Sequence, residues 1–332
     1  MQPSQSLLPA PAGTLIPIAS PRPVYSLGDV EKRLSKLPVK DHEPLRHTYE
    51  RMLEMGPDRF HVKPSGLPAM DRLYEELPNF REPLDDVRRQ LALCQGTSDP
   101  LEITPMLLVG PPGVGKTHFA REITQLLGTG LGFVSMSSLT AGWILSGASS
   151  QWKGARPGKV FDVLVDGFYA DPVMVVDEID KASSDQAYDP LGALYSLLEH
   201  DTSTHFTDEF AEVAIDASQL IWVATANHVR SIPDPILNRM NVYEVQPPDP
   251  HAARAIAIRL YTSITSSHEW GSQFSKEPSE EVLAVMSAMA PREMRRAWMT
   301  ALGNARLAKH SRVELQDIPE RRSGRNPMGF AH

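Results

Sequence analysis

The sequence predicts an α/β protein: a doubly wound domain with a parallel β-sheet, followed by a smaller domain built only of helices. Three short apolar runs carry this prediction, and they span residues 106–109, 173–176 and 220–225. Continuous apolar runs of this length are typical of buried parallel strands. Helical segments at 117–127 and 191–199 lie between them, and this alternation is characteristic of a doubly wound sheet.

Two segments precede the first apolar run. Residues 1–24 are rich in proline, and we predict a disordered tail there because such a segment buries little apolar surface. Residues 25–98 are expected to form a helical N-terminal extension. Its predicted helices begin or end at proline or glycine, and they span residues 29–37, 44–55, 67–77 and 83–94.

The remaining boundaries follow from the change of pattern. The α/β domain is predicted at residues 99–246, the all-α domain at residues 247–318 and a flexible tail at residues 319–332. Three helices are expected in the all-α domain, at residues 251–263, 279–289 and 292–309.

Composition narrows the classes of function. The formal net charge of −8 gives no support to a general nucleic-acid binder. Cys94 is the single cysteine, which excludes an intrachain disulfide and a thiolate metal cluster. No run of about 18 apolar residues occurs, and no basic start precedes an unbroken apolar stretch, so no membrane partner is expected. The expected location is the cytoplasm.

The segment GPPGVGKT, residues 110–117, fits the pattern G-x-x-x-x-G-K-[ST]. Glycines let the backbone direct successive N–H groups at phosphate oxygens, and the following helix adds its positive end. Lys116 would reach the β- and γ-phosphates, and Thr117 would offer its hydroxyl to Mg²⁺. A chance glycine turn is the alternative. The strand before the motif and the helix after it favour an ATP site.

Polar residues follow the other two apolar runs. In VMVVDEID (173–180), Asp177 is placed to hold the metal through a coordinated water, and Glu178 to orient and deprotonate the attacking water. An acidic cap on the next segment is the alternative. Asn227 follows the third run, where its amide would hold the attacking water or touch the γ-phosphate. A turn-forming asparagine is the alternative there.

Together these segments resemble the AAA+ ATPases. The matching order is GPPGVGKT, VVDEID, VATAN, PDPILNRM (233–240) and APREMRRA (290–297). The closer likeness is to the ATPase module of the Lon family. It is carried by WKGARPGKVFDVL (152–164), DEIDKASSDQAYDPLGALYSLLE (177–199) and HFTDEFAEVAIDASQLIWVATANHVRSIPDPILNRM (205–240). The resemblance covers about residues 80–310 and implies a P-loop α/β large domain with an α-helical lid.

The resemblance implies further roles in the nucleotide site. Asn227 stands at the first sensor, and Arg239 at the arginine finger that reaches the ATP of a neighbouring subunit, unless Arg239 forms only a surface ion pair. Arg292 stands at the second sensor, with Arg295 and Arg296 as close competitors. The residues expected to contact the nucleotide are Gly110, Pro111, Pro112, Gly113, Val114, Gly115, Lys116, Thr117, His118 and Arg292.

The resemblance also implies a pore that grips polypeptide. Trp152, followed by Lys153 and Gly154, occupies the position of the aromatic residue of the pore loop, and Tyr188 is assigned to a second pore loop. The alternative is that Trp152 packs in the core. Two positions depart from the family pattern: Trp152 replaces the usual Tyr, and Asn238 stands where Asp is usual. His332 follows soon after the lid, so we expect no intrinsic protease domain.

The expected function is therefore Mg²⁺-dependent ATP hydrolysis in a homo-oligomeric ring, a hexamer, which remodels or unfolds a polypeptide. A DNA-linked AAA+ ATPase, such as a loader or a transposition regulator, shares the ATP motifs. The acidic balance and the lack of an obvious helix-turn-helix oppose it. A scaffold that binds nucleotide without hydrolysis is a third hypothesis, opposed by the intact Lys116, Asp177, Glu178, Asn227 and Arg239.

Overall fold

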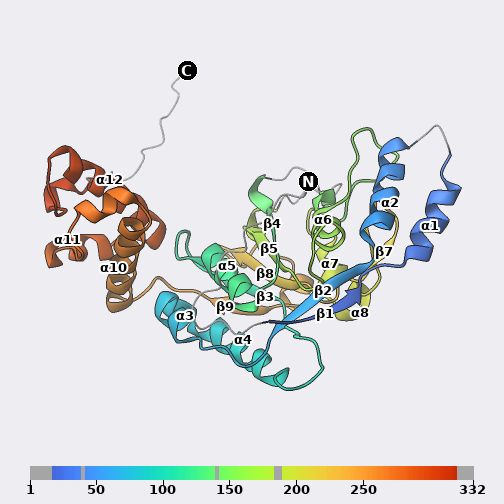
Figure 1. Cartoon of the computed structure of the whole chain (residues 1–332), viewed down its shortest axis with the longest axis horizontal. Coiled ribbons are helices and arrows are strands. Elements are labelled where there is room, and N and C mark those ends of the chain that lie inside the picture. The colour runs from blue at the N-terminus through green and yellow to red at the C-terminus, as the bar shows by residue number, and fades with distance from the viewer. Residues whose placement is uncertain (1–16, 39–41, 139–141, 183–188, 320–332) are drawn as a thin grey trace. The chain divides into compact units, whose positions relative to one another are not determined.

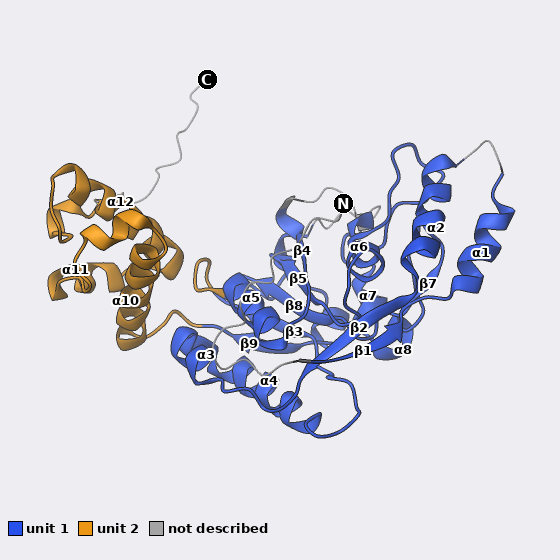
Figure 2. Cartoon of the chain, in the orientation of Figure 1, with its two compact units in different colours: residues 1–110, 116–245 blue, residues 111–115, 246–332 orange. Residues whose placement is uncertain are grey.

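The computed structural model describes residues 17–38, 42–138, 142–182 and 189–319 (Figure 1). The chain divides into two compact units (Figure 2). The first unit comprises residues 1–110 and 116–245, and the second comprises residues 111–115 and 246–332. Within the described ranges, no helix has both the length and the apolar character needed to cross a membrane.

A five-stranded parallel sheet forms the centre of the first unit, with the strand order β4-β5-β8-β3-β9. Its strands are β3 (Met106–Val109), β4 (Leu131–Ser135), β5 (Val173–Asp177), β8 (Ile221–Ala226) and β9 (Asn241–Glu244). The predicted α/β class is confirmed. The three predicted runs are the inner strands β3, β5 and β8, whereas the edge strands β4 and β9 were not predicted. A glycine or polar residues interrupt the apolar run in these strands, as at Gly132 and Ser135 of β4 and at Asn241 and Glu244 of β9.

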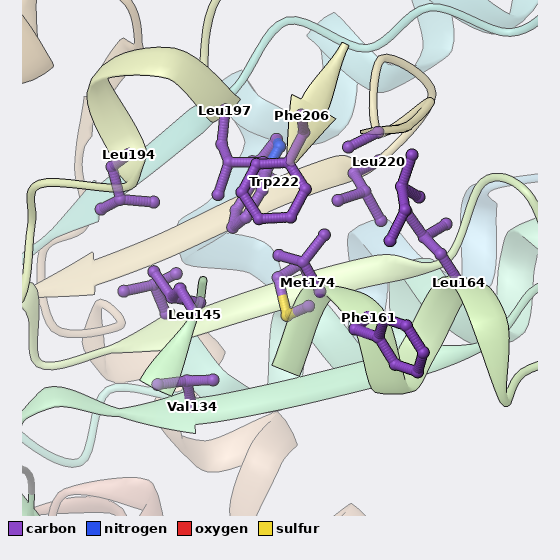
Figure 3. Packing of buried hydrophobic residues seen from close by; sticks show 14 of the residues in the cluster. Val134, Leu145, Phe161, Leu164, Met174, Leu194, Leu197, Phe206, Leu220 and Trp222 are labelled. Carbon is purple, nitrogen blue, oxygen red and sulfur yellow. The ribbon is translucent and has the colours of Figure 1, made fainter. Parts of the chain in front are cut away.

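Helices and buried side chains pack around this sheet. The helices are α4 (Arg81–Leu93), α5 (Lys116–Leu127), α6 (Lys159–Val165), α7 (Leu194–Leu197), α8 (His200–Ser203) and α9 (Asp234–Leu237). Figure 3 shows Trp222 on β8 and Met174 on β5 meeting Leu164 and Phe161 of α6 in one apolar cluster. The predicted helix at 191–199 is shorter in the structure, because Glu199 is extended and separates α7 from α8.

The N-terminal extension contains an antiparallel ribbon of β1 (Pro17–Pro23) and β2 (Asp58–Pro64), beside α1 (Leu27–Lys36), α2 (Glu43–Met55) and α3 (Asp71–Glu76). The prediction of disorder is therefore wrong over residues 17–23, and the extension contains, besides its predicted helices, the strand β2, which was not predicted. In an antiparallel pair, every second residue of β1 directs its N–H group away from β2. Pro17, Pro21 and Pro23 are all among these residues, so their missing N–H groups remove no hydrogen bond between β1 and β2.

Buried polar residues of β2 attach the ribbon to the sheet domain. Arg59 donates to the carbonyl oxygens of Leu164, at 2.8 Å, and Val165, which form the last turn of α6. A cation there satisfies free carbonyls and complements the helix dipole. Along the edge of β2 that faces away from β1, the Phe60 N–H donates to Phe168 O at 2.8 Å, and the Ala170 N–H donates to Phe60 O at 2.9 Å.

Lys63 and His61 complete the attachment of β2. The Lys63 ammonium donates to the carbonyl oxygens of Thr97 at 2.6 Å and Asp99 at 2.7 Å, in the loop after α4. The His61 imidazole lies 3.5 Å from the buried carboxylate of Asp171, which also accepts the N–H of Val62 at 2.9 Å. The extension is thus fixed to the sheet domain by specific polar contacts.

The second unit contains α10 (Pro250–Ser266), α11 (Glu280–Ser287) and α12 (Pro291–Leu307). Trp298 of α12 is fully buried, donates its indole N–H to Ala257 O at 3.0 Å and packs against Tyr261, with ring centroids 5.0 Å apart. Asp249 and Ser279 cap the starts of α10 and α11. All three predicted helices are present, each with slightly different ends.

Candidate functional site

The glycine-rich loop leaves the sheet at Gly110. A Cβ at this position would lie 2.1 Å from the carbonyl oxygen of Val245, so only glycine fits without movement of the backbone. Gly113 and Gly115 have φ of +86° and +109°, conformations that residues with a Cβ rarely adopt. The glycines predicted from the motif therefore occupy positions where the bend of the backbone requires them.

Lys116 and Asn227, predicted from separate motifs, meet at the carboxyl ends of neighbouring strands. The Lys116 ammonium donates to Gly110 O at 2.6 Å and to Asn227 Oδ1 at 3.3 Å. Lys116 is only 9% exposed. Burial lowers its pKa, while the carboxylates of Asp177, Asp180 and Glu178 act in the opposite direction. A desolvated ammonium at this place interacts strongly with a bound anion.

Asp177 ends β5 and accepts two hydroxyl hydrogen bonds on one oxygen. Thr117 Oγ1 donates to Asp177 Oδ1 at 3.0 Å, and Thr225 Oγ1 donates to the same atom at 2.7 Å. The predicted pair Thr117 and Asp177 is thus brought together. Thr225 was not predicted. A hydroxyl residue inside the otherwise apolar strand IWVATA was the signal that could have identified it.

Glu178 follows Asp177 in a left-handed backbone conformation, with φ of +55° and ψ of +48°. Its N–H donates to Thr225 Oγ1 at 3.0 Å, and its carbonyl accepts the N–H of Lys181 at 2.9 Å. The next two residues form an ion pair: Lys181 Nζ lies 3.9 Å from Asp180 Oδ2, and the Asp180 side chain is almost fully buried. The backbone of Glu178 is therefore held by hydrogen bonds on both sides, directly after Asp177 at the end of β5.

Arg239 follows the short helix α9 and is partly exposed. Its Nε atom lies 2.7 Å from Glu199 Oε1, and its Nη1 atom donates to Pro235 O at 2.6 Å. These contacts fix the guanidinium on the surface of the first unit. Contact with a neighbouring subunit stays a prediction.

Arg292 and Gly113 both belong to the second unit. The N–H of Arg292 donates to Gly113 O at 3.4 Å, and Arg292 Cβ is the atom nearest to a Cβ built on Gly113, at 3.5 Å. The side chains of Arg292, Arg295 and Arg296 are at least partly exposed. This arrangement favours Arg292 over its two competitors for contact with the glycine-rich loop, and its sensor role stays a prediction.

Trp152 lies in a turn and is 54% exposed, so the alternative that it packs in the core is wrong. Its N–H donates to Ser149 O at 2.9 Å, and its carbonyl accepts the N–H of Ala155 at 3.1 Å. Trp152 also borders a hollow of about 590 Å³, together with Trp143 and other residues. Tyr188, assigned to a second pore loop, lies outside the described residues.

Asp208 forms a hydrogen bond to Gly158, which follows the turn that contains Trp152. This carboxylate is fully buried and accepts the N–H groups of Gly158 at 2.8 Å, Phe210 at 2.9 Å and Ala211 at 3.0 Å. Burial raises its pKa to about 6, while these hydrogen bonds act in the opposite direction. Sequence reasoning missed Asp208, because its partner Gly158 lies in a segment 50 residues away.

Comparisons with known proteins relate part of this chain to one family of ATPases. The family "ATPase family associated with various cellular activities (AAA)" matches residues 106–247. A peroxisomal Lon protease homolog 2 of Spinacia oleracea is 34% identical over 189 residues, which are 57% of this chain and 21% of that protein. A Lon protease of Halothermothrix orenii is 34% identical over 165 residues, 49% of this chain and 21% of that protein. The chain therefore spans about a fifth of the length of these relatives.

Two solved structures share the fold at low sequence identity. The Saccharomyces cerevisiae Hsp104:casein complex, in its extended conformation, gives a TM-score of 0.58 at 17% identity and covers 85% of this chain and 51% of that one. A point mutant of Thermotoga maritima RuvB gives 0.51 at 15% identity, covering 77% of this chain and 70% of that one. Residues 106–247 therefore match the AAA family of ATPases, and the chain is similar in sequence to Lon proteases over about half of its length.

Proposed function

We propose that the protein binds ATP with Mg²⁺ and hydrolyses it to ADP and phosphate at the strand ends that carry Lys116, Asp177 and Asn227. One observation carries this proposal: the hydrogen bonds that join Thr117 to Asp177, and Lys116 to Asn227, across segments far apart in sequence. Ligands of doubly wound sheets bind at the carboxyl ends of the strands. These hydrogen bonds lie at that edge.

The oxygen atoms of Thr117 and Asp177 suit Mg²⁺. They lie 3.0 Å apart, and hydroxyl and carboxylate oxygens are ligands that this ion prefers. Among the residues that the structure describes, no group of three or more His, Cys, Asp or Glu side chains is arranged to hold a metal alone. Magnesium sites of this class use one or two protein ligands plus substrate phosphates. The bound ion would neutralise charge that develops on the phosphates.

The side chains of this chain divide the remaining work. Lys116 exchanges its carbonyl partner Gly110 for phosphate oxygens, and its desolvation strengthens that contact. Glu178 accepts a proton from the attacking water, and Asn227 holds that water in line with the γ-phosphate. Arg292 contacts the same nucleotide from its place beside Gly113.

Arg239 is proposed to act on the ATP of a neighbouring subunit in a ring, with a hexamer as the expected assembly. Its guanidinium would stabilise negative charge on the γ-phosphate in the transition state. In the single chain it is paired with the half-exposed Glu199, and an exposed ion pair of this kind is weak enough to exchange for phosphate. The similarity in fold to Hsp104, solved in complex with casein, supports a polypeptide as the substrate, gripped at the exposed Trp152.

Phosphate release from ATP and Mg²⁺ tests the proposal, with Glu178→Gln and Lys116→Ala as variants. We expect Glu178→Gln to bind ATP without turnover and Lys116→Ala to lose binding. Full turnover by Glu178→Gln contradicts the assignment of the base. Mixing Arg239→Ala with Lys116→Ala protein should change turnover if sites are shared between subunits, and unchanged turnover contradicts the ring.

A second assay separates the two classes of substrate. An unfolded polypeptide such as casein should stimulate phosphate release by the wild type, and Trp152→Ala should lose this stimulation while it keeps basal activity. Stimulation by DNA but not by unfolded protein would favour the DNA-linked alternative. The cytoplasmic location stays a prediction.

A further inference from the structure

We propose that Thr225 is a positioning residue for hydrolysis, which holds Glu178 in its left-handed conformation and fixes the carboxylate of Asp177. This inference rests on the proposed function, since it explains how the proposed base and the proposed metal ligand keep separate directions. Thr225 does not contact the nucleotide in this scheme and acts only through its two neighbours.

The position of Thr225 in the sheet makes this contact possible. Strand β8 lies between β5 and β3, so Thr225 is inside the sheet, at the strand end next to Asp177. The side chain is 1% exposed. Its hydroxyl donates to Asp177 Oδ1 at 2.7 Å and accepts the Glu178 N–H at 3.0 Å.

The hydroxyl group uses both of its capacities at once. A threonine hydroxyl has one proton to donate and lone pairs to accept with. Here the hydroxyl donates its proton to the carboxylate of Asp177, and its oxygen accepts a hydrogen bond from the backbone N–H of Glu178. A valine has the same shape but can do neither. The two hydrogen bonds therefore depend on chemistry that only Thr or Ser supplies in this strand.

The left-handed backbone of Glu178 gives this contact its importance. Residues with a Cβ avoid a φ of +55°, and they keep it only when surrounding contacts determine it. Two contacts do so: the N–H of Glu178 to Thr225 and its carbonyl to the N–H of Lys181. Loss of the hydrogen bond to Thr225 would let the peptide bond before Glu178 rotate. The Glu178 carboxylate would then move away from the position proposed for the base.

The remainder of β8 supports a specific role for the hydroxyl. The strand reads Ile-Trp-Val-Ala-Thr-Ala, every position is buried, and Thr225 is its one hydroxyl-bearing residue. Burial of a hydroxyl is unfavourable unless hydrogen bonds compensate for it. Core packing alone would be served as well by valine at this position. The threonine is therefore explained by what it holds at the site.

The test compares Thr225→Val with Thr225→Ser. Partners that orient residues of a metal site change activity by roughly tenfold to a hundredfold when removed. We expect Thr225→Val to lose kcat by that order, with the affinity for ADP in the absence of Mg²⁺ unchanged. Thr225→Ser keeps the hydroxyl and should restore kcat. A valine variant with wild-type kcat, beside an inactive Glu178→Gln variant, overturns the inference and leaves the proposed function standing.

Hydrogen exchange supplies a readout that does not depend on turnover. The amide of Glu178 should exchange faster in Thr225→Val than in wild type and in Thr225→Ser, whether or not ATP is hydrolysed. Unchanged exchange in the valine variant overturns the inference. If Thr225→Val does not fold, Thr225→Ala takes its place with the same expectations. A wild type that releases no phosphate refutes the proposed function alone, since the exchange result still decides the role of Thr225.

Discussion

Replacement of Asp171 by Asn should make the stability of the protein less dependent on pH. The Asp171 carboxylate is 1% exposed and accepts from the Val62 N–H at 2.9 Å and from the Thr129 hydroxyl at 3.2 Å. Burial raises its pKa to about 7, while these hydrogen bonds act in the opposite direction. Burial also lowers the pKa of the neighbouring His61, with Arg22 and Lys63 adding to this effect, so near pH 7 the imidazole is neutral and does not compensate the carboxylate.

The sign and the magnitude follow from linkage. The pKa of Asp171 is about 7 in the folded chain against an ordinary value of 3.8, so the folded state binds the proton more tightly. The stability from this proton is complete below pH 3.8 and is lost as the pH rises through about 7. A difference of about 3 in pKa corresponds to about 4 kcal/mol, of which about 2.5 kcal/mol falls between pH 5 and pH 8.

Urea unfolding of wild type and Asp171→Asn at several pH values from 5 to 8 measures this effect. Asparagine keeps an acceptor for the Val62 N–H and offers a donor to the Thr129 hydroxyl, which itself donates to the Asp171 carbonyl at 3.0 Å. The wild-type free energy of unfolding should fall by about 2.5 kcal/mol more than that of the variant. The titration of Asp208, which does not contact Asp171, occurs in both proteins, so subtraction removes it. Parallel curves for the two proteins would refute the reasoning.

Three further substitutions test other parts of the structure. Lys63→Met removes a buried donor to the carbonyls of the loop after α4 and should cost about 3 kcal/mol in urea unfolding, whereas the exposed control Lys32→Met should stay within about 0.5 kcal/mol. Equal effects would contradict the role of Lys63. Gly110→Ala forces the backbone away from Val245 and should weaken ATP binding at least about tenfold in equilibrium titration; unchanged affinity would show that the loop tolerates the Cβ. Trp152→Ala should change the free energy of unfolding by less than about 0.5 kcal/mol, and a larger loss would indicate that the ring supports the fold.

The inner strands could be predicted because burial on both faces leaves a continuous apolar run, as at residues 106–109 and 173–176. The meeting of Lys116, Thr117, Asp177 and Asn227 could also be predicted, because the carboxyl ends of parallel strands lie at one edge of the sheet. These positions follow from local pattern plus one rule of topology.

Strand β2 could not be predicted in this way. Its buried residues include Arg59, His61 and Lys63, which look like a solvent-exposed set in the sequence. Their partners include carbonyl oxygens and a carboxylate more than 30 residues away, so burial becomes favourable only in the folded chain. Thr225 was missed for a similar reason. Its hydroxyl matters because of two hydrogen-bond partners, the Asp177 carboxylate and the Glu178 N–H, which strand β5 brings beside it.

The prolines of β1 have a consequence for the edge of that strand that faces away from β2. Of the four residues whose N–H side faces away from β2, Pro17, Pro21 and Pro23 offer no donor, and Ala19 alone retains one. An incoming extended peptide needs alternate donors and acceptors to add itself as a further strand. A protein proposed to work on unfolded chains meets such peptides constantly. The outer edge of β1 is thereby a poor template for the addition of such peptides.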